Sequence, residues 1–353
     1  MAKHSIAYIY PRSTTFVQKD IRLLDDAFKV IEFNGRLSSA HSLPLLLIRQ
    51  FFFLLLHPSC KVYVCMFAGY HALLPGLFAR LLGKKMIIIA GGADAVSFPS
   101  LGYGNFRKNP LAWATAQSFR LSHHIAPVSE SLIAQDSEYQ QEFGPQGYKH
   151  FIKGLRTRST AIANGYDAGF WVSDDSGRQD DLFLTVATHV ETAARRSIKG
   201  LDLFLLLARE LPTYHFMIVG CAKTDLGALP SNVAVVEHAQ PSELIKLYSR
   251  ASYYVQLSVS EGFPNALCES MLCGCVPLVS AVGAMPEIVA DTGYVLFEKR
   301  EDSALELFRQ AVGNKSAHPV LSEKARERVA TLYTEEKRKS ALTALIQYVI
   351  SRK

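Results

Sequence analysis

The sequence lacks the patterns that mark several classes of protein. Its six cysteines include no CxxC pair and no Cys/His spacing suited to zinc, so we expect them to be buried and reduced. No Gly-x-Gly-x-x-Gly follows a predicted strand, which argues against a NAD-binding protein. The 38 Lys and Arg residues form no long run or repeated motif, and a nucleic-acid partner is therefore not expected.

Signals for export and for membrane insertion are also lacking. The first ten residues do not combine a basic stretch, an apolar stretch and a small-residue cleavage site, so we expect a cytoplasmic location. The run Leu43–Leu56 is shorter than the roughly 20 apolar residues of a transmembrane helix, and Arg49 and Gln50 interrupt it. It is open to three interpretations: a core-packed helix, a helix lying on a membrane with its aromatic face inserted, or a spanning helix. The net charge of +6 would suit an anionic surface, so a peripheral contact through residues 43–56 would lie at the inner face of a membrane.

The length and the periodicity indicate two α/β domains. At about 150 residues per domain, 353 residues predict two domains. Short apolar runs alternate with helical patterns in both halves, which is typical of a parallel sheet covered on both faces. The polar stretch 174–181 (DDSGRQDD) interrupts this alternation. We therefore predict two doubly wound domains, 1–173 and 182–335, joined by the linker 174–181, with a C-terminal helix at 336–353 that packs back on the first domain.

The stretch from Ser258 to Glu287 carries the strongest chemical signal. A predicted strand ends near Leu257, and a tight loop leads into a helix that begins near Asn265. Unpaired N–H groups at such a helix start form a natural anion site. Glu261 and Glu269 are eight residues apart, so both carboxylates can face one cleft and accept hydrogen bonds from the hydroxyls of a sugar or a ribose. The alternative is that both are solvated acids near a helix start, where the helix dipole favours them.

These residues resemble a known family. EGFPNALCE, residues 261–269, looks like the E-x7-E motif of the retaining family 4 type glycosyltransferases, which have the GT-B fold. Other segments resemble further parts of that family's pattern. In the second half these are residues 197–201 (SIKGL) with Asp202, 215–220 (HFMIVG), 273–280 (CGCVPLVS) and 283–289 (GAMPEIV). In the first half they are the NGYD turn at 164–167 and the GGAD loop at 91–94. The resemblance covers nearly the whole chain, is most specific over 182–296 and is loose in the first 60 residues.

The resemblance implies a role for each matched position. Glu269 would hold the ribose of a nucleotide-sugar donor, and Lys199 would neutralise the departing diphosphate. Glu261 would bind the donor sugar and phosphates. The remaining donor-side positions are the backbone of Gly262, Phe263 and Pro264, the helix-start residues Asn265, Ala266 and Leu267, and Gly220. An ordinary solvated lysine at a helix start is the alternative for Lys199.

The sequence departs from the family in two places. The family often has an arginine after the first strand of the second domain, but this chain reads VATH there. Arg195 or Arg196 would substitute, and we favour Arg196. The first-domain loop 12–17 (RSTTFV) lacks the family's Gly-rich turn; its hydroxyls, such as that of Thr15, would cap the next helix or touch the acceptor or a phosphate. Asp94 and His71 are the other candidates on the acceptor or sugar side.

The function that the resemblance implies is transfer of a sugar, with retention, from a nucleotide-sugar to an acceptor hydroxyl. The enzyme would be of the hexosyltransferase type and would act in cell-surface polysaccharide or lipid-linked glycan synthesis. We expect no cofactor and no metal, because no DxD-type aspartate pair stands out. Two alternatives stay open: a catalytically silent GT-B protein that binds a nucleotide or a partner, and a GT-B sugar-nucleotide epimerase.

Overall fold

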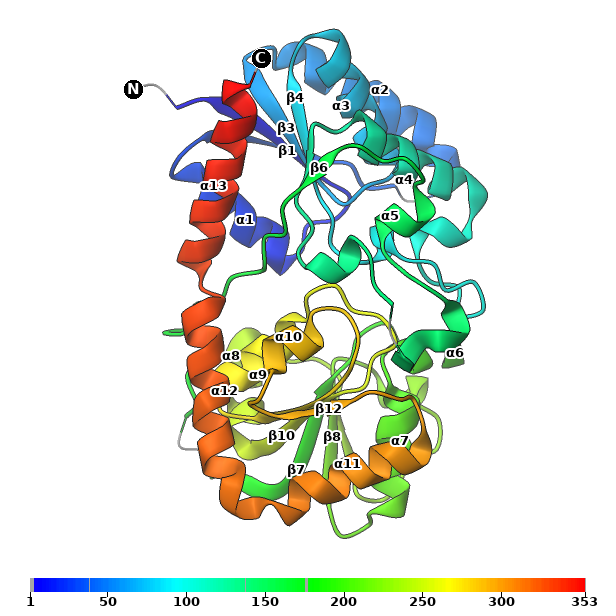
Figure 1. The fold of residues 1–353 in the computed structure, drawn as a ribbon, viewed down its shortest axis with the longest axis vertical. Coiled ribbons are helices and arrows are strands. Elements are labelled where there is room, and N and C mark those ends of the chain that lie inside the picture. Colours follow the sequence, from blue (N-terminus) through cyan, green and yellow to red (C-terminus); the bar gives the residue numbers. More distant parts are fainter. Residues whose placement is uncertain (1–2, 38, 137, 175–176, 353) are drawn as a thin grey trace.

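Two parallel sheets form the framework of the chain, one in each domain (Figure 1). The computed structural model describes residues 3–37, 39–136, 138–174 and 177–352. The first sheet has the strand order β2-β1-β3-β4-β5-β6 and the second has the order β12-β11-β10-β7-β8-β9. Every paired strand within these sheets is parallel. The prediction of two doubly wound α/β domains is confirmed.

The first domain begins with regular alternation of strand and helix. Its strands are β1 (Ser5–Tyr10), β2 (Lys29–Asn34), β3 (Cys60–Met66), β4 (Lys85–Ile89), β5 (His124–Ile125) and β6 (Arg158–Ser159). Its helices are α1 (Thr15–Asp25), α2 (Leu43–Leu56), α3 (Tyr70–Leu81), α4 (Asn109–Leu121) and α5 (Tyr148–Phe151). The sequence predicts β5 and β6 at 125–128 and 160–163, but both strands end earlier along the chain. Beyond them the two segments continue as extended chain, and Ile162 N–H donates to the Pro127 carbonyl at 2.8 Å.

The second domain repeats the pattern. Its strands are β7 (Gln179–Val186), β8 (His215–Val219), β9 (Val233–Val236), β10 (Ala251–Gln256), β11 (Val276–Ser280) and β12 (Tyr294–Leu296). Its helices are α6 (Ala193–Ile198), α7 (Leu201–Glu210), α8 (Pro241–Arg250), α9 (Asn265–Leu272), α10 (Met285–Val289), α11 (Glu301–Gly313) and α12 (His318–Leu332). Strand β7 takes up the last three residues of the predicted linker 174–181, and residues 175–176 of that linker lie outside the described residues.

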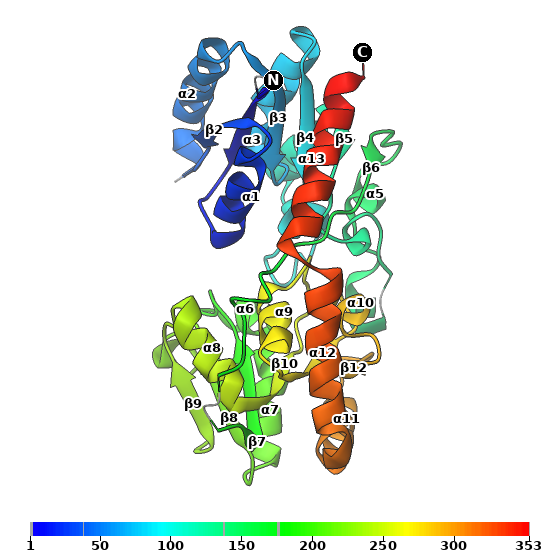
Figure 2. The ribbon, with the colours of Figure 1, turned by 90° about the vertical axis from the view of Figure 1, so that its left-hand side faces the viewer.

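The chain returns to the first domain at its end. The predicted C-terminal helix at 336–353 is α13 (Glu335–Ser351), and α12 precedes it; periodicity over 322–353 does not show the break between the two. The break lies at Tyr333–Thr334, where the Thr334 hydroxyl accepts from Lys337 N–H at 3.1 Å and begins α13. Helix α12 packs on the second domain, whereas α13 packs on α1, β3 and β4 of the first (Figure 2). The last helix therefore ties the two domains together.

The helices of the first domain form two layers. Helices α1 and α13 cover one face of the sheet, and α2, α3 and α4 lie on the other, with α3 packed between its two neighbours (Figure 1). Helix α2 is not enclosed by the core, because only Leu46, Gln50 and Leu54 of its side chains are buried. None of the described helices is both long and apolar enough to cross a membrane. The spanning interpretation of residues 43–56 is therefore wrong. One side of α2 does pack on the core, through Leu46 and Leu54, and the contact with a membrane stays a prediction.

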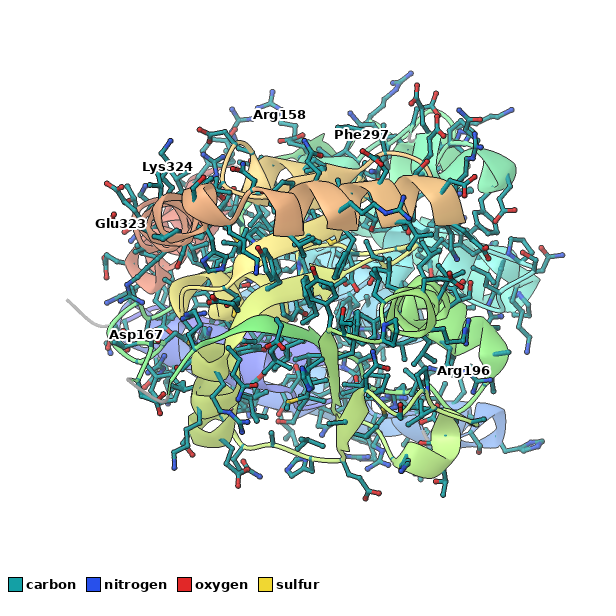
Figure 3. The ribbon with its side chains drawn as sticks, turned by 90° about the horizontal axis from the view of Figure 1, so that it is seen from below. Arg158, Asp167, Arg196, Phe297, Glu323 and Lys324 are labelled. Carbon is teal, nitrogen blue, oxygen red and sulfur yellow. The ribbon has the colours of Figure 1, made fainter. Side chains whose placement is uncertain are left out.

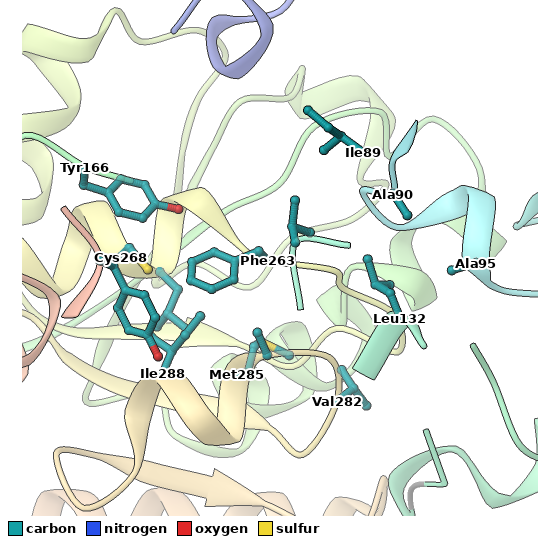
Figure 4. Close-up of a cluster of buried hydrophobic side chains, with 14 of the residues drawn as sticks. Ile89, Ala90, Ala95, Leu132, Tyr166, Phe263, Cys268, Val282, Met285 and Ile288 are labelled. Carbon is teal, nitrogen blue, oxygen red and sulfur yellow. The ribbon is translucent and has the colours of Figure 1, made fainter. Parts of the chain in front are cut away.

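A hydrophobic cluster joins the domains between the two sheets. Ile89, Ala90 and Leu132 of the first domain lie near Phe263 and Met285 of the second (Figure 4). Two polar contacts add to it: the Tyr139 hydroxyl donates to the Leu257 carbonyl at 2.9 Å, and the Tyr166 hydroxyl donates to Asn265 Oδ1 at 2.7 Å. The carboxyl ends of the strands of the two sheets meet at this junction, which is where doubly wound sheets bind ligands.

Candidate active site

The predicted donor site lies at the carboxyl edge of the second sheet, where the strand order reverses. Strands β10 and β7 are neighbours at this point. The chain leaves β7 toward α6 and leaves β10 toward α9, so the loops after both strands meet above the same edge. A crevice outside the strand ends at such a switch point is the usual ligand site of an open α/β sheet.

The junction between α6 and α7 is held against the loop after β10. Gly200 adopts a left-handed conformation with φ of 70°, and a Cβ there would lie 2.1 Å from the Leu257 carbonyl oxygen. Only glycine fits both the conformation and the close approach. Val259 N–H donates to the Ile198 carbonyl at 2.8 Å and fastens the same contact. The Lys-Gly pair is thus needed to bring Lys199 to the loop that carries Glu261.

Lys199 and Glu261 form an ion pair at this contact. Lys199 Nζ lies 2.9 Å from Glu261 Oε1, although the two residues are 62 positions apart in the sequence. The Ser258 hydroxyl donates to the same carboxylate oxygen at 3.0 Å. The side chains are 32% and 14% exposed, so the pair is accessible from the cleft without being free in solvent. Attraction by Glu261 raises the pKa of Lys199, which keeps a fixed cation at this point of the site.

Glu269 lies one turn inside α9, on the side that faces the first domain. Burial raises the pKa of its carboxyl to about 7, and the charge of Lys19 on α1 opposes this shift. Lys19 itself donates to the Gly165 carbonyl at 2.8 Å and lies over the ring of Tyr166. The Glu269 side chain is half-buried, on the side of α9 that faces Lys19. Its raised pKa distinguishes it from an ordinary surface glutamate.

The loop between Glu261 and α9 touches the first domain through its backbone. A Cβ at Gly262 would lie 2.3 Å from the Gly91 carbonyl oxygen, so no other residue fits there in this arrangement of the domains. The GGAD loop at 91–94 and the loop at 261–264 are consequently in direct contact. Asp94 shapes the first of them: it accepts hydrogen bonds from the N–H groups of Ala68, Gly91 and Gly92 at 2.9–3.1 Å.

Side chains at the other donor-side positions serve the packing. Phe263 stacks on Tyr166 and meets Tyr333 edge-on in the interdomain cluster (Figure 4). Pro264 precedes the first turn of α9 and is buried, and Leu267 is fully buried in the core. What these residues offer a ligand is their backbone. Ala266 is half-buried at the helix start.

Asn265 and Gly220 are the two remaining candidates of the donor site. Asn265 is the first residue of α9, and Gly220 follows β8. Asn265 Oδ1 accepts from Asn164 Nδ2 at 3.1 Å as well as from Tyr166, so this side chain joins the domains. Gly220 follows β8 with φ of 103° and lies against Ala187 and Thr188 of the loop after β7. Both residues thus lie near the carboxyl edge of the second sheet, and their contact with a donor stays a prediction.

The two candidate arginines lie on the same short helix, α6. Arg196 is half-buried, donates to the carbonyl of Asp225 at 2.7 Å and approaches that of Val190, so its guanidinium braces the loop after β8. Arg195 is exposed. Which of the two is the second cation near Lys199 stays a prediction.

A cavity of about 510 Å³ lies in the first domain beside this site. It opens at the carboxyl ends of β1, β3 and β4, the switch point of the first sheet. Both acceptor-side candidates Asp94 and His71 line it. Burial raises the pKa of Asp94 and lowers that of His71, and His71 Nε2 lies 2.8 Å from the Met66 carbonyl oxygen. Both side chains are thus partnered by backbone, and both contribute polar surface to a mainly apolar wall.

The hydroxyls of the first loop do not cap α1. Thr14 is the residue before the helix, but its side chain makes no capping hydrogen bond, and Thr15 is exposed on the first turn. The expectation of a hydroxyl cap is therefore wrong. Thr14 Oγ1 is instead buried in the cavity wall and has no hydrogen-bond partner among the residues that the structure describes. A bound molecule would supply the missing partner.

Tyr103 is a cleft residue that the sequence reasoning missed. It ends a tight hairpin in which Phe98 and Tyr103 exchange backbone hydrogen bonds at 2.8 and 3.1 Å. Burial raises the pKa of its hydroxyl, and the charges of Lys199, Glu261 and Asp94 all act on it. Charged groups of both domains therefore act on this hydroxyl. The only signal in the sequence is the Gly-Tyr-Gly triplet at 102–104 after the GGAD loop.

Comparison with known proteins bears on the family and the fold. Residues 187–328 match the sequence model of the family described as glycosyl transferases group 1. No curated protein matches the chain in sequence. Sucrose-phosphate synthase from Thermosynechococcus elongatus is similar in structure, with a TM-score of 0.72 at 14% identity over 99% of this chain and 100% of that one.

Two more solved structures are similar over the whole chain. A glycosyltransferase from Rickettsia africae has a TM-score of 0.68 at 11% identity, covering 100% of both chains. HepE from Anabaena, solved in complex with UDP, has a TM-score of 0.67 at 12% identity over 98% of this chain and 100% of that one. At these identities the likeness concerns the fold. The chain therefore has the GT-B fold, and its second domain carries the sequence match to glycosyl transferases group 1.

Proposed function

We propose that the protein is a retaining glycosyltransferase that moves a hexose from a nucleotide-sugar donor to a hydroxyl of an acceptor glycan. The observation that carries the proposal is the pair of Lys199 and Glu261, 2.9 Å apart on the edge of the second sheet that faces the first domain. The family match over 187–328 supports a sugar-transfer reaction. HepE of the same fold is described in complexes with UDP and UDP-glucose, which makes a UDP-sugar the first donor to test.

The donor would lie along the carboxyl edge of the second sheet. Glu269 would accept hydrogen bonds from the ribose hydroxyls, which a carboxylate does better than a neutral group. The N–H groups at the start of α9 would face the phosphates, because the first four N–H groups of a helix have no partner within it. Glu261 would contact the donor sugar, and Lys199 would face the diphosphate as a fixed cation.

The reaction would exchange one bond for another at the anomeric carbon. The bond from that carbon to the diphosphate oxygen breaks, and a bond to the acceptor oxygen forms on the same face. The acceptor proton passes to the departing phosphate oxygen. Negative charge grows on the diphosphate as it leaves, so Lys199 and the α9 N–H groups lower the barrier by stabilising that charge. Since these groups do the work of a cation, we propose that the reaction needs no metal.

Nucleotide binding is the first test. We expect one of UDP, GDP and ADP to bind when titrated in a calorimeter with a chelator present, and we expect UDP to be that nucleotide. Lys199→Ala and Glu269→Ala should each weaken binding about tenfold or more, because each removes a charged hydrogen-bonding group. Lys299→Ala is the matched control: this lysine forms an ion pair with Asp202 at 2.7 Å near the same helix junction. It should leave the affinity unchanged.

The outcomes separate the alternatives. Transfer from UDP-glucose to an acceptor, with the same anomeric configuration in product and donor by NMR, supports the proposal. Interconversion of the donor without any acceptor points to an epimerase instead. Binding without turnover of any donor points to a silent binding protein. If none of the three nucleotides binds, the donor-site assignment is wrong.

The raised pKa of Glu269 predicts a pH dependence of nucleotide affinity. Its pKa of about 7 means that the carboxylate loses its charge as the pH falls through neutrality. The affinity of the wild type for the nucleotide should therefore rise between about pH 6 and about pH 8, and Glu269→Gln should bind more weakly and rise less, keeping only the part that comes from ionisation of the terminal phosphate. Calorimetry at matched ionic strength measures both. Equal slopes for the two proteins would refute this role of the carboxyl.

Glu269→Gln should at the same time stabilise the protein. A carboxyl whose pKa is raised on folding disfavours the folded state once it is ionised; the penalty grows above the unfolded pKa and is complete above about pH 7. Removing the ionisable group should raise the free energy of unfolding at about pH 8 by on the order of 1–3 kcal/mol and change little at about pH 4.5. A variant that binds the nucleotide more weakly but unfolds less easily would show that Glu269 serves binding and lowers the stability of the fold.

A further inference from the structure

The outer face of the layer formed by α2, α3 and α4 exposes large apolar side chains. Ten of the sixteen exposed large hydrophobic residues in the described chain lie between residues 45 and 113. They are Leu45, Ile48, Phe51, Phe52, Leu55 and Leu56 on α2, Leu77 and Leu81 on α3, Leu82 directly after α3, and Trp113 on α4. We call this set the apolar face. Single exposed apolar residues are ordinary, but a set on adjoining helices marks an interaction site.

Helix α2 differs from an ordinary surface helix, because Leu46 and Leu54 are buried on its inner side while further apolar residues are exposed on its outer side. Its uncharged polar residue, Gln50, is buried and donates from Nε2 to the His71 carbonyl at 2.7 Å. Leu45, Ile48, Phe52 and Leu55 follow one another at helical spacing on the exposed side. A helix that packs on a core normally turns its apolar side inward and its polar side to solvent. This helix is apolar on its outer side as well, so that side is built for an apolar surrounding.

The stretch of chain that carries the apolar face has exposed charges of one sign. Between Glu32 and Glu130 the chain has nine basic residues: Arg36, Arg49, Lys61, Arg80, Lys84, Lys85, Arg107, Lys108 and Arg120. Its one acid in that stretch, Asp94, is buried. The stretch therefore has a formal charge of +8, and because the whole chain has +6, the remainder has −2. Positive charge is concentrated in the same part of the chain as the exposed apolar residues.

We propose that the protein docks on an anionic lipid bilayer through the apolar face. A bilayer interface accepts aliphatic and aromatic side chains into the headgroup region and attracts the cations around them, which matches both properties of this surface. A helix of 14 residues is about 21 Å long and lies in the plane of the interface instead of crossing it. A water-soluble partner protein would explain the apolar residues but not a stretch of this length without an exposed acid.

The docked orientation also specifies the class of acceptor, and this step rests on the proposed function. Leu46 of α2 lines the cavity of about 510 Å³ that contains Asp94 and His71. A second, polar cavity of about 570 Å³ shares Arg12 and Leu37 with it and adds Arg36. Leu46 lies on the inner side of α2, so docking through the outer side would hold both cavities close to the lipid surface, behind α2. An apolar cavity next to a pair of arginines fits an acceptor with a lipid chain and a phosphate.

Vesicle flotation tests the docking directly. The full chain, without nucleotide, is mixed with vesicles of phosphatidylcholine alone or of equal parts phosphatidylcholine and phosphatidylglycerol. We expect flotation with the anionic vesicles and little with the neutral ones. The double variant Phe52→Ser, Leu56→Ser removes side chains that are 56% and 75% exposed and should lower the partition coefficient at least about tenfold.

A matched control removes equally exposed residues elsewhere. Phe297 and Val320 of the second domain are 61% and 54% exposed, and Phe297 lies at a different edge of the molecule (Figure 3). Phe297→Ser, Val320→Ser should float as the wild type does. Arg107→Gln, Lys108→Gln, which leaves the apolar side chains in place, should lower binding to the anionic vesicles by roughly fivefold per residue and weaken its salt dependence.

Each outcome bears on the proposal. A wild type that stays at the bottom of the gradient with anionic vesicles overturns it, and so does unchanged flotation of the Phe52 and Leu56 variant. Equal binding to neutral and anionic vesicles overturns the part that the cations play. Nucleotide calorimetry on the same preparations needs no lipid. Retained nucleotide affinity shows that the Phe52 and Leu56 variant is folded. The same measurement separates a failure of docking from a failure of the proposed function.

Discussion

Replacing Lys199 with alanine is expected to lower kcat for sugar transfer by about 10²–10³. The diphosphate gains negative charge as the bond to the anomeric carbon breaks, so a fixed cation stabilises the transition state more than the bound donor. Lys199 is held in place for this by Gly200, whose conformation admits no side chain, and by the ion pair with Glu261 at 2.9 Å. Because the larger effect is on the transition state, kcat should fall by more than KM for the donor rises.

Three variants make this expectation specific to the charge. Lys199→Arg keeps a cation near the same place and should recover part of the lost rate, whereas Lys199→Met, which keeps the length without the charge, should not. Lys299→Ala removes a lysine with a similar ion pair on the same side of the domain and should change kcat less than about twofold. Steady-state kinetics with product anomer analysis measures all four. A Lys199→Ala enzyme with wild-type kcat would remove Lys199 from the mechanism.

Product binding gives an independent readout. Lys199 is proposed to contact the diphosphate and not the nucleoside, so Lys199→Ala should weaken a nucleoside diphosphate about tenfold or more and the free nucleoside hardly at all. Glu269→Gln should instead weaken the nucleoside and the nucleoside diphosphate alike, because Glu269 is proposed to bind the ribose that both contain. The opposite pattern would exchange the two assignments.

The sequence predicts the fold well where one segment determines its own structure. The apolar runs at Ser5–Tyr10 and Val276–Ser280 are strands with the predicted ends, because continuous apolar residues fit a sheet that is covered on both faces. It does less well where the structure depends on distant partners. Strand β6 is displaced to Arg158–Ser159 because its pairing with β5 decides where it lies. The break between α12 and α13 depends on a bridge from Tyr166 to Thr334 that no local pattern shows.

The candidate site also has residues that one segment of sequence predicts and residues whose position depends on distant partners. The helix start at Asn265 and the two glutamates follow from a single segment and its resemblance to a family. The direction of Arg196 does not, because it is set by carbonyls of Val190 and Asp225 on two other loops. Tyr103 could not be found either, since its place in the cleft depends on contact between two domains. The orientation of α2, with Gln50 inward, follows from the packing of α2 against α3, which the sequence of α2 alone does not contain.

Replacing Arg338 with methionine is expected to cause the largest loss of stability, about 3–5 kcal/mol in the free energy of unfolding. Arg338 on α13 is almost fully buried and binds Asp20 of α1 through two hydrogen bonds of 2.5 and 2.7 Å. It also donates to the carbonyls of Ile162 and Ala163, and the Tyr8 hydroxyl donates to Asp20 Oδ2 at 3.1 Å. The variant leaves the Asp20 carboxylate buried with no cation beside it, which is the costly case for a buried pair.

The neighbouring residue supplies the matched control. Lys339 forms an ion pair with Asp26 at 2.7 Å, but Asp26 is 70% exposed, so Lys339→Met should cost less than about 1 kcal/mol. Denaturant unfolding followed by circular dichroism measures both variants. The double variant Asp20→Asn, Arg338→Met should be destabilised by clearly less than the sum of its single variants, because no charge is then left unpaired. Helix α13 brings the chain from the second domain back onto the first. A loss below about 1 kcal/mol for Arg338→Met would mean that the buried ion pair does not fix α13 on the first domain. The apolar contacts of α13 would then do so alone.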